Sequence, residues 1–489
     1  MMSLQQLLPD WTLSAAASCQ VSGLCLDSRR VRDGDLFLAL SGGARDGRGF
    51  VDAAIHAGAA AVLMESEHFS EAMQGGVPMI GVPSLGAQLG ELAGRFHGYP
   101  ARDLTVLGVT GTNGKSSVAW FLRDALNAAG MPCGLIGTLG ARFADYEHDT
   151  GHTTPDVLTL HEVLAAFRDR GARYVAMEVS SHALTQHRLD GVSVHTAAFT
   201  NLSRDHLDYH GDMDSYFVAK RRLFEGRELA AAAINVADSY GVRLANELGP
   251  HIRCVRIGGE QADVGLRRLH QHAAGMDLAL AIADDVISLQ LPLYGRFNVD
   301  NLMVVAGMLA LQGLDAGRIG AALAAVTPVP GRMQPVREGD GPVVLVDYAH
   351  TPDGLEKALL AVRDHFSGTV WCLFGCGGNR DAGKRPMMAA VAERLADRLV
   401  LTSDNPRAES PTDILNDMLA GLRQPTAADV IVDRPAAVRH AVNLAQPGDV
   451  ILLAGKGHER WQEIGGKRLA MDDCELARDA LRARRGGAA

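Results

Sequence analysis

Short apolar runs alternate along the chain with longer stretches in which apolar residues recur every three or four positions. The first pattern is typical of buried strands and the second of amphipathic helices. Together they predict strands at residues 34–40, 61–64, 104–110, 174–179, 195–200, 343–347, 370–375, 398–402 and 449–455, and helices at 51–60, 116–129 and 298–312. This alternation favours an α/β fold whose mainly parallel sheets are covered on both faces.

Two segments rich in glycine and proline divide the chain. Residues 97–100 follow a first small α/β unit, and residues 327–331 follow a second. Such segments are typical of linkers. We therefore expect three domains, at residues 1–100, 101–330 and 331–489. In the last one, strands ending in polar or glycine residues indicate an open sheet whose ligand loops follow the strand ends.

Composition and charge exclude several classes of protein. The 489 residues carry a net charge of −10, which argues against a nucleic-acid or anionic-membrane surface. No apolar run approaches the roughly 20 residues of a membrane span. No lysine or arginine precedes Arg29, so we expect no signal peptide. Seven scattered cysteines without a CxxC pair fit reduced thiols, and we expect a cytoplasmic protein.

Lysine is rare in this chain and marks candidate sites. Of 47 basic residues, 41 are arginine. The six lysines are Lys115, Lys220, Lys357, Lys384, Lys456 and Lys467. A lysine amine can lose its proton and react, which an arginine cannot do. Lys357 and Lys467 lie in stretches that we expect to be solvated, whereas the other four lie in distinctive motifs.

A glycine-rich segment, residues 108–117, lies between a predicted strand and a predicted helix. Such a loop directs backbone N–H groups and a helix N-terminus at phosphate. Lys115 would neutralise the β/γ-phosphates, and the Ser116 hydroxyl would bind Mg²⁺. The strict GxxxxGK[ST] pattern is missed at one position, because Val109 stands where its first glycine belongs. A glycine-rich turn with a chance Lys-Ser is the alternative.

Further candidate metal ligands follow later strands. Glu178 lies near the end of the strand predicted at 174–179, and residues 201–210 contain His206 among carboxylates and imidazoles. A carboxylate at that strand end could reach the same metal as the glycine-rich loop. A solvated Glu or a hydrogen-bonded loop histidine would explain either residue alone. With Lys220 added, the group becomes more specific.

Together these motifs resemble the Mur ligases, which are ATP-dependent amide-forming enzymes of peptidoglycan synthesis. The matching segments, in family order, are GVTGTNGKSS, MEVSSH, NLSRDHLDYH, AKRRLF, GRFNVDN, DYAHTPD and GKGHE. Residues 27–37 and 403–407 are similar to the members that add meso-diaminopimelate to UDP-N-acetylmuramoyl-L-alanyl-D-glutamate. The resemblance implies a small N-terminal α/β substrate domain, a central P-loop ATPase-like domain with a mainly parallel sheet, and a C-terminal Rossmann-like α/β domain.

The resemblance also implies a reaction. ATP would phosphorylate the D-Glu carboxylate, the amine would attack the acyl phosphate, and two Mg²⁺ ions would stabilise the transferring group. Lys220 would carry a CO₂-derived carbamate, which converts an amine into an oxygen ligand. The implied catalytic residues are Lys115, Glu178, His206 and Lys220, and the implied metal ligands are Ser116, Glu178, His206 and Lys220. The implied ATP-binding residues are Gly111, Thr112, Asn113, Gly114, Lys115, Ser116, Ser117, Asn301, Asp347 and His350.

Two further sets of residues are implied for the other substrates. The UDP-sugar-peptide set is Leu26, Ser28, Gly43, Ala44, Arg45, Thr153, Thr154, Ser180, Gln186 and Arg188. The diaminopimelate set is Arg380, Asp404, Asn405, Pro406, Arg407, Gly455 and Glu459. Within that set the arginines suit the distal carboxylate, and the acceptor atoms suit the distal ammonium. His152 stands where we expect asparagine, so one side-chain contact should differ. For Asp347 and His350 a capped strand end is the alternative.

Several other functions compete with this one. An L-lysine-adding muramyl ligase would leave Arg407 unpaired in a desolvated pocket. A folylpolyglutamate synthase-like ligase has a similar loop and lysine, but residues 27–37 and 404–407 argue against it. A P-loop kinase or motor ATPase would need no amino acid, and a non-catalytic ATP-binding regulator would not need the metal motifs. We expect small-molecule substrates, no nucleic-acid or membrane partner, and a monomer.

Overall fold

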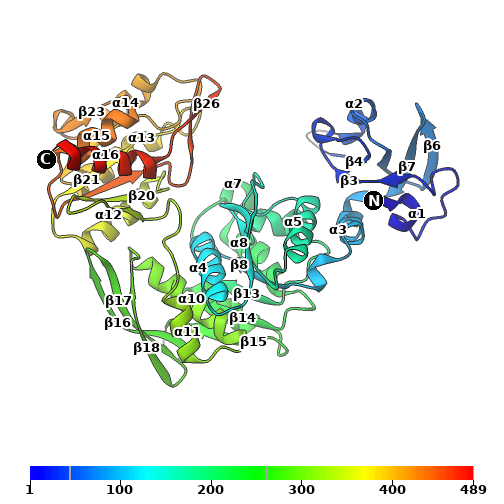
Figure 1. Cartoon of the computed structure of the whole chain (residues 1–489), viewed down its shortest axis with the longest axis horizontal. Helices are drawn as coiled ribbons and strands as arrows, with labels where there is room; N and C mark the ends of the chain where they lie inside the picture. The colour runs from blue at the N-terminus through cyan, green and yellow to red at the C-terminus, as the bar shows by residue number, and fades with distance from the viewer. Residues whose placement is uncertain (43–45, 260–261, 488–489) are drawn as a thin grey trace. The chain divides into compact units, whose positions relative to one another are not determined.

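The computed structural model of the chain describes residues 1–42, 46–259 and 262–487. Tertiary contacts divide the chain into two compact units. The first comprises Met1–Lys115, Gly130–Ala233 and Arg243–Cys254, and the second comprises Ser116–Ala129, Ile234–Val242 and Val255–Ala489. Figure 1 labels many of the helices and strands of both units.

A five-stranded sheet forms the N-terminal part of the first unit. Its order is β3-β4-β5-β7-β6, and all neighbours are parallel except β6 and β7. The elements are β1 (Met2–Ser3), α1 (Leu4–Leu7), β2 (Gln20–Val21), β3 (Gly23–Cys25), β4 (Asp35–Ala39), α2 (Val51–His56), β5 (Ala61–Ser66), β6 (Ser70–Gln74), β7 (Val77–Pro83) and α3 (Leu85–Phe96). Leu36 and Leu38 pack in a core with α1 and α3, whereas Phe37 packs with α2. The period of two along β4 therefore supplies both cores.

The rest of the first unit positions the glycine-rich loop. Strands β9, β12, β8 and β13 are parallel neighbours in that order, and β10 and β11 extend them antiparallel. The elements are β8 (Thr105–Thr110), β9 (Cys133–Gly137), β10 (Gly140–Phe143), β11 (Tyr146–His148), α5 (Val157–Asp169), β12 (Tyr174–Glu178), α6 (Ser181–Thr185), β13 (Thr196–Phe199), α7 (Leu207–His210) and α8 (Met213–Arg221). Glu178, the last residue of β12, pairs in register with Val109 near the end of β8. Because neighbouring parallel strands end at the same edge of the sheet, Glu178 lies beside the start of the loop.

The second unit begins with a helical and an antiparallel part. Strands β16, β17 and β18 form an antiparallel ladder, visible as a long arm in Figure 1. On β18, alternate residues are buried, as expected for a strand with one covered face. The elements of the central segment are α4 (Lys115–Ala128), β14 (Ala231–Asn235), α9 (Ser239–Glu247), β15 (Arg253–Ile257), β16 (Val264–His272), β17 (Gly275–Ile282), β18 (Asp285–Leu291), α10 (Phe297–Leu311) and α11 (Ala316–Leu323). The division between the two units runs through α4, β14, α9 and β15.

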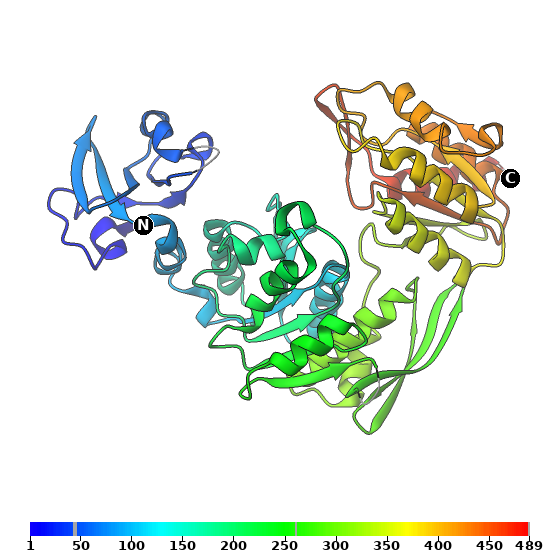
Figure 2. The same ribbon diagram turned by 180° about the vertical axis from the view of Figure 1, so that it is seen from behind.

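A six-stranded sheet, β19-β20-β24-β21-β22-β23, completes the second unit, and only β19 is antiparallel to its neighbour. Its elements are β19 (Gln334–Val336), β20 (Val343–Asp347), α12 (Pro352–His365), β21 (Val370–Phe374), α13 (Lys384–Leu395), β22 (Arg398–Leu401), α14 (Pro411–Leu419), β23 (Ala428–Val430), α15 (Arg434–Leu444), β24 (Val450–Ala454), β25 (Trp461–Ile464), β26 (Lys467–Ala470) and α16 (Asp473–Gly487). Helices α12, α13 and α14 cover one face and α15 and α16 the other (Figure 2). The continuous apolar runs reflect this burial on both faces.

The predicted α/β class with three domains is confirmed. Each predicted strand is present within one or two residues, and so are the helices predicted at 116–129 and 298–312. Helix α2 ends at His56 rather than at residue 60. The antiparallel arm was not predicted. The domain boundaries at 100 and 330 stay predictions. In the described part of the chain, no helix is long and apolar enough to cross a membrane.

Candidate active site

The glycine-rich loop, residues 111–117, follows β8 and enters α4. Gly111 has φ +146°, and a Cβ added there would lie 1.9 Å from Oγ1 of Thr200. Gly114 also has a positive φ of +88°. Only glycine allows so close an approach at that φ without strain. The predicted residues Gly111 to Ser117 therefore lie where a strand turns tightly into a helix, and Ser117 is already buried in that helix.

The segment after β13 holds this loop in place. Thr200 Oγ1 donates to the carbonyl of Asn113 (2.6 Å), and Asn201 Oδ1 accepts from the Asn113 N–H (3.0 Å). The Asn201 carbonyl accepts from the Thr112 N–H, and the Ser203 N–H donates to Thr112 Oγ1. These bonds fix the backbone that would face phosphate. The sequence reading had not assigned Thr200 and Asn201 to the site.

Two lysines converge on the carbonyl of Gly111. Lys115 Nζ donates to it and to the Thr112 carbonyl, both at 2.9 Å. Lys220, on α8, is buried and donates to the same Gly111 oxygen at 2.7 Å. Burial, reinforced by the charge of Lys115, lowers the pKa of Lys220 well below its ordinary value. An amine of this kind can be neutral and nucleophilic at neutral pH.

Glu178 lies buried at the end of β12. Its Oε1 accepts from the Thr138 N–H at 2.8 Å, and its Oε2 accepts from the Thr138 hydroxyl at 3.2 Å. A Cβ added at Gly137 would lie 2.2 Å from Oε1, so this neighbour must be glycine. The carboxylate is therefore oriented by Thr138, which directly follows β9. It is not solvated, which was the alternative expectation for a glutamate at a strand end.

His206 is half exposed and has a left-handed backbone, φ +52°. Its ring lies edge-on to His182 with 5.0 Å between ring centres, and the ring of His182 lies 4.2 Å from that of Tyr209. Burial and the neighbouring His206 lower the pKa of His182. Among the described residues, no three His, Cys, Asp or Glu side chains meet as a metal site. Glu178 and His206 are the only predicted ligands of those types.

The predicted peptide-binding residues cluster around the end of β12. Thr154 Oγ1 donates to the Glu178 carbonyl (2.8 Å) and accepts from the Ser180 N–H (3.1 Å). Thr153 contacts Thr138 through their hydroxyls (3.1 Å). Arg188 donates to the Thr154 carbonyl at 2.8 Å. The Thr-Thr segment is therefore fixed directly beside the carboxylate of the predicted metal site.

A cavity of about 310 Å³ opens next to these residues. Leu26, Gln186 and Arg188 line it together with His152, which stands where asparagine was expected. Gln186 Oε1 accepts from Arg188 Nη2 at 2.7 Å, and this hydrogen bond orients the guanidinium. Ser28 begins a short 3-10 turn capped by Asp27. The predicted residues Gly43, Ala44 and Arg45 lie outside the described residues.

Three predicted ATP-binding residues outside the glycine-rich loop belong to the second unit. Asn301 is buried on α10 and donates to Asn298. Asp347 ends β20, and its two oxygens accept from the Met333 and Ala349 N–H groups, both at 2.8 Å. Burial nevertheless raises the pKa of Asp347. The capped-strand alternative thus accounts for both hydrogen bonds of the Asp347 carboxylate. His350 is exposed three residues farther on.

The predicted amino-acid pocket forms where β22 and β24 end. Asp404 and Asn405 are buried, and Asn405 Nδ2 donates to Glu459 Oε2 at 2.8 Å. Gly455 has φ +112°, and a Cβ there would lie 2.7 Å from Oδ2 of Asp404. The Gly455 backbone can therefore approach Asp404 closely. Asp404, Asn405, Gly455 and Glu459, whose acceptor atoms we matched to the distal ammonium, therefore lie together.

Arg407 lies at the end of the same loop. Its backbone is left-handed, φ +53°, and is held by the Glu463 carbonyl, which accepts from the Arg407 N–H at 2.9 Å. Its guanidinium donates to the Gly378 carbonyl at 2.8 Å, with Nε 3.6 Å from Oε2 of Glu463. Pro406 is buried and Arg380 is exposed. The Arg407 side chain therefore extends from a backbone held by a hydrogen bond.

Sequence reasoning missed the groups behind this pocket. Arg434 and Asp473 form a fully buried ion pair at 2.6 Å. Arg434 also donates to the carbonyls of Ser403 and Ala454, which precede Asp404 and Gly455. Lys456, noticed only as a rare lysine, is buried as well. Nothing local in the sequence marks Arg434, because its carboxylate partner lies 39 residues away.

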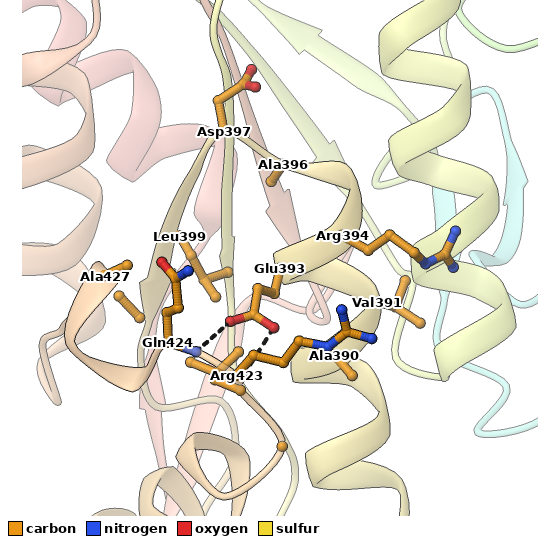
Figure 3. Close-up of a pocket in the computed structure, with 13 residues that line it drawn as sticks. Ala390, Val391, Glu393, Arg394, Ala396, Asp397, Leu399, Arg423, Gln424 and Ala427 are labelled. Atoms are coloured by element: carbon orange, nitrogen blue, oxygen red, sulfur yellow. Dashed lines mark hydrogen bonds between the residues drawn. The ribbon is translucent and has the colours of Figure 1, made fainter.

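A larger cavity, about 550 Å³, lies elsewhere in the second unit (Figure 3). It is lined by α13 and by residues 421–428, and no residue predicted for a substrate is among its described lining. Glu393 accepts there from the N–H groups of Arg423 (3.0 Å) and Gln424 (2.8 Å). These backbone hydrogen bonds lower the pKa of Glu393. The carboxylate therefore closes a turn of the fold rather than offering a ligand site.

Comparisons with known proteins identify the family of the chain. Three family models match: the catalytic domain of the Mur ligase family at residues 20–97, the Mur ligase middle domain at 109–309, and the Mur ligase glutamate ligase domain at 331–457. The UDP-N-acetylmuramoyl-L-alanyl-D-glutamate--2,6-diaminopimelate ligase of Xylella fastidiosa is 47% identical over 99% of this chain and 98% of its own.

Solved structures are similar too. A structure of a UDP-N-acetylmuramoyl-L-alanyl-D-glutamate--2,6-diaminopimelate ligase is 33% identical, with a TM-score of 0.71 over 99% of both chains. The MurF ligase of Thermotoga maritima in complex with ADP shares the fold, with 17% identity and a TM-score of 0.64 over 96% of this chain and 99% of its own. The chain belongs to the Mur ligase family of ATP-dependent, amide-bond-forming ligases.

Proposed function

We propose that this ligase joins meso-2,6-diaminopimelate to the D-Glu carboxylate of UDP-N-acetylmuramoyl-L-alanyl-D-glutamate. The observation that carries the proposal is the pocket of Asp404, Asn405, Glu459 and Arg407. It combines acceptors for an ammonium with a guanidinium for a carboxylate, which is the pair of groups at the far end of diaminopimelate. The relatives that share this chain's full length carry that activity in their names.

ATP is proposed to bind at the glycine-rich loop, with Asn301, Asp347 and His350 as further contacts. Its phosphates would accept from the N–H groups of residues 111–117, and Lys115 would leave the Gly111 carbonyl for the β/γ-phosphates. The fixed backbone supports this reading, because Thr200 and Asn201 hold the loop before any nucleotide arrives.

Mg²⁺ is proposed at Ser116, Glu178, His206 and Lys220. Mg²⁺ prefers oxygen ligands, which an amine does not provide. Lys220 fits only if its buried, neutral amine adds CO₂: the nitrogen forms a bond to carbon, loses a proton, and becomes a carbamate with an anionic oxygen. The lowered pKa of Lys220 supports this reaction. Bound Mg²⁺ would offset charge on the phosphoryl group.

The chemistry then follows in two steps. The D-Glu carboxylate attacks the γ-phosphorus and ADP leaves, which gives an acyl phosphate. The amine of diaminopimelate attacks the acyl carbon, phosphate leaves, and the nitrogen loses its proton. Arg188 is proposed to orient the peptide beside Glu178 through its guanidinium. This reaction belongs to peptidoglycan precursor synthesis, and we propose that a cytoplasmic monomer performs it.

The test is ADP release from ATP and the UDP-muramoyl dipeptide, with product mass measured. We expect sustained release, over many turnovers, only when meso-diaminopimelate is added, and a product heavier by one diaminopimelate residue. The second candidate, an L-lysine-adding ligase, predicts equal turnover with L-lysine. Sustained release with neither amino acid, beyond the one ADP per enzyme that acyl phosphate formation gives, would instead indicate a phosphotransferase or ATPase and would contradict the proposal.

A further inference from the structure

Lys456 is a buried cation without a role in the reaction described so far. Its side chain is fully buried between β24 and β25. Its Nζ donates to Asn405 Oδ1 at 3.1 Å and to Glu459 Oε2 at 3.2 Å, and it lies 5.5 Å from the ring centre of Trp461. Both hydrogen-bond partners are acceptors proposed for the distal ammonium of the amino acid. A buried charge is tolerated only when it is paired in this way.

The first consequence of Lys456 concerns the amide of Asn405. Its Oδ1 accepts from Lys456 and from the Glu463 N–H (3.0 Å), so its Nδ2 must point the other way, toward Glu459. An amide can be flipped unless its neighbours differ in hydrogen-bonding type. Lys456 and the Glu463 N–H, which can only donate, together remove that ambiguity. The orientation of Asn405 is therefore set before the substrate arrives.

The second consequence concerns Glu459. Lys456 and Asn405 both donate to its Oε2, and in the described part of the chain no hydrogen bond reaches its Oε1. The side chain is 20% exposed, so this oxygen can still meet a ligand. A carboxylate oxygen fixed in this way is suited to accept from a second ammonium.

We propose that Lys456 is a positioning residue that sets Glu459, both directly and through Asn405, to recognise the distal ammonium of the amino-acid substrate. The inference rests on the proposed function, because the ligand is the diamino acid assigned there. Lys456 does not touch the substrate; it acts through its two partners. Arginine would not replace Lys456, because its planar guanidinium needs more room than the single Nζ atom that lies between Asn405 Oδ1 and Glu459 Oε2.

The experiment compares two substrates in two proteins. Meso-diaminopimelate and L-2-aminopimelate share the reacting amine and both carboxylates, but only the first carries a distal ammonium. The variant is Lys456→Met, which keeps the stem and removes the charge. The control is Lys357→Met, on an exposed lysine of α12 paired with Asp353. For each enzyme we would measure kcat/KM with both amino acids, and KM for ATP.

Wild type and Lys357→Met should have a higher kcat/KM with meso-diaminopimelate than with L-2-aminopimelate. In Lys456→Met the ratio of these two values should fall at least about tenfold, because the KM for meso-diaminopimelate rises. The KM for ATP should stay within about twofold. A role in folding alone would lower turnover of both amino acids equally, so an unchanged preference in Lys456→Met overturns the inference. If wild type itself shows no preference, the proposed ligand is wrong and the inference falls with it. Should Lys456→Met not fold, Lys456→Gln carries the same comparison with the same deciding outcome.

Discussion

The glycine-rich loop of the first unit and the amino-acid pocket of the second are built by opposite means. The loop is shaped by backbone: Gly111 has no room for a side chain, and Lys115 rests on carbonyl oxygens. The pocket is shaped by buried ionic side chains, Arg434 with Asp473 and Lys456 with Glu459. Phosphate is recognised by N–H groups that any sequence supplies, whereas an amino acid with two charged ends needs side chains of set charge.

The comparison implies that removing a cation of the loop lowers the rate of the reaction, whereas removing a cation of the pocket lowers stability or substrate selectivity. Lys115→Ala tests the first part. We expect kcat to fall at least about 10³-fold, because the charge is needed as the γ-phosphoryl group moves. Thermal unfolding should change little, because Lys115 is only half buried and its removal leaves no charge buried in a core. Steady-state kinetics decides, with Lys357→Ala as control; a kcat near that of wild type contradicts a phosphate role.

Arg434→Met tests the second part. Removing one partner of a fully buried pair leaves Asp473 uncompensated, and we expect the free energy of unfolding to fall by about 3–5 kcal/mol. The double variant Arg434→Met/Asp473→Leu should recover part of that loss, because no lone buried charge remains. Urea denaturation of the three proteins measures both effects. A single variant as stable as wild type would show that the pair does not support the pocket.

Arg407→Ala should act on selectivity rather than on folding. A bidentate arginine–carboxylate pair removed from one side costs about 2–5 kcal/mol, or roughly 30-fold or more in kcat/KM for meso-diaminopimelate. Binding of ATP should stay near normal. Arg407→Lys should restore little, since an ammonium cannot reproduce the planar fork. Kinetics with meso-diaminopimelate and L-lysine measure this, and an unchanged KM and kcat in Arg407→Ala would remove Arg407 from the site.

The same contrast explains what the sequence could predict. Strands such as 343–347 were found within a residue or two, because burial on both faces leaves an uninterrupted apolar run. The glycine-rich loop was found because its residues are contiguous. Lys456 received no role, because its partner Asn405 lies 51 residues away and only the fold unites them. Asp347 was open to two readings for the same reason, since Met333 belongs to another segment.

Lowering the pH is a milder way to distinguish the two units, because their stabilities should respond differently. Burial, with the nearby charges of His161 and Arg168, lowers the pKa of His97 to about 4, from an ordinary value of 6.5. The folded first unit therefore keeps His97 neutral while the unfolded chain takes up a proton below pH 6.5. Its contribution to stability is complete above that pH and is lost as the pH falls toward 4.

Between pH 7 and pH 5 this linkage should remove about 1–2 kcal/mol from the free energy of unfolding. His161 has its pKa lowered in the same direction by burial. Replacement of His97 by glutamine should flatten the pH dependence, because glutamine does not titrate. Hydrogen exchange at the two pH values locates the loss of stability, which we expect in α3 and α5. We expect no loss around Arg434, because its pKa is raised and its charge does not change in this range. Equal loss of protection around Arg434 would mean that the ionic pocket is no more resistant to acid than the first unit.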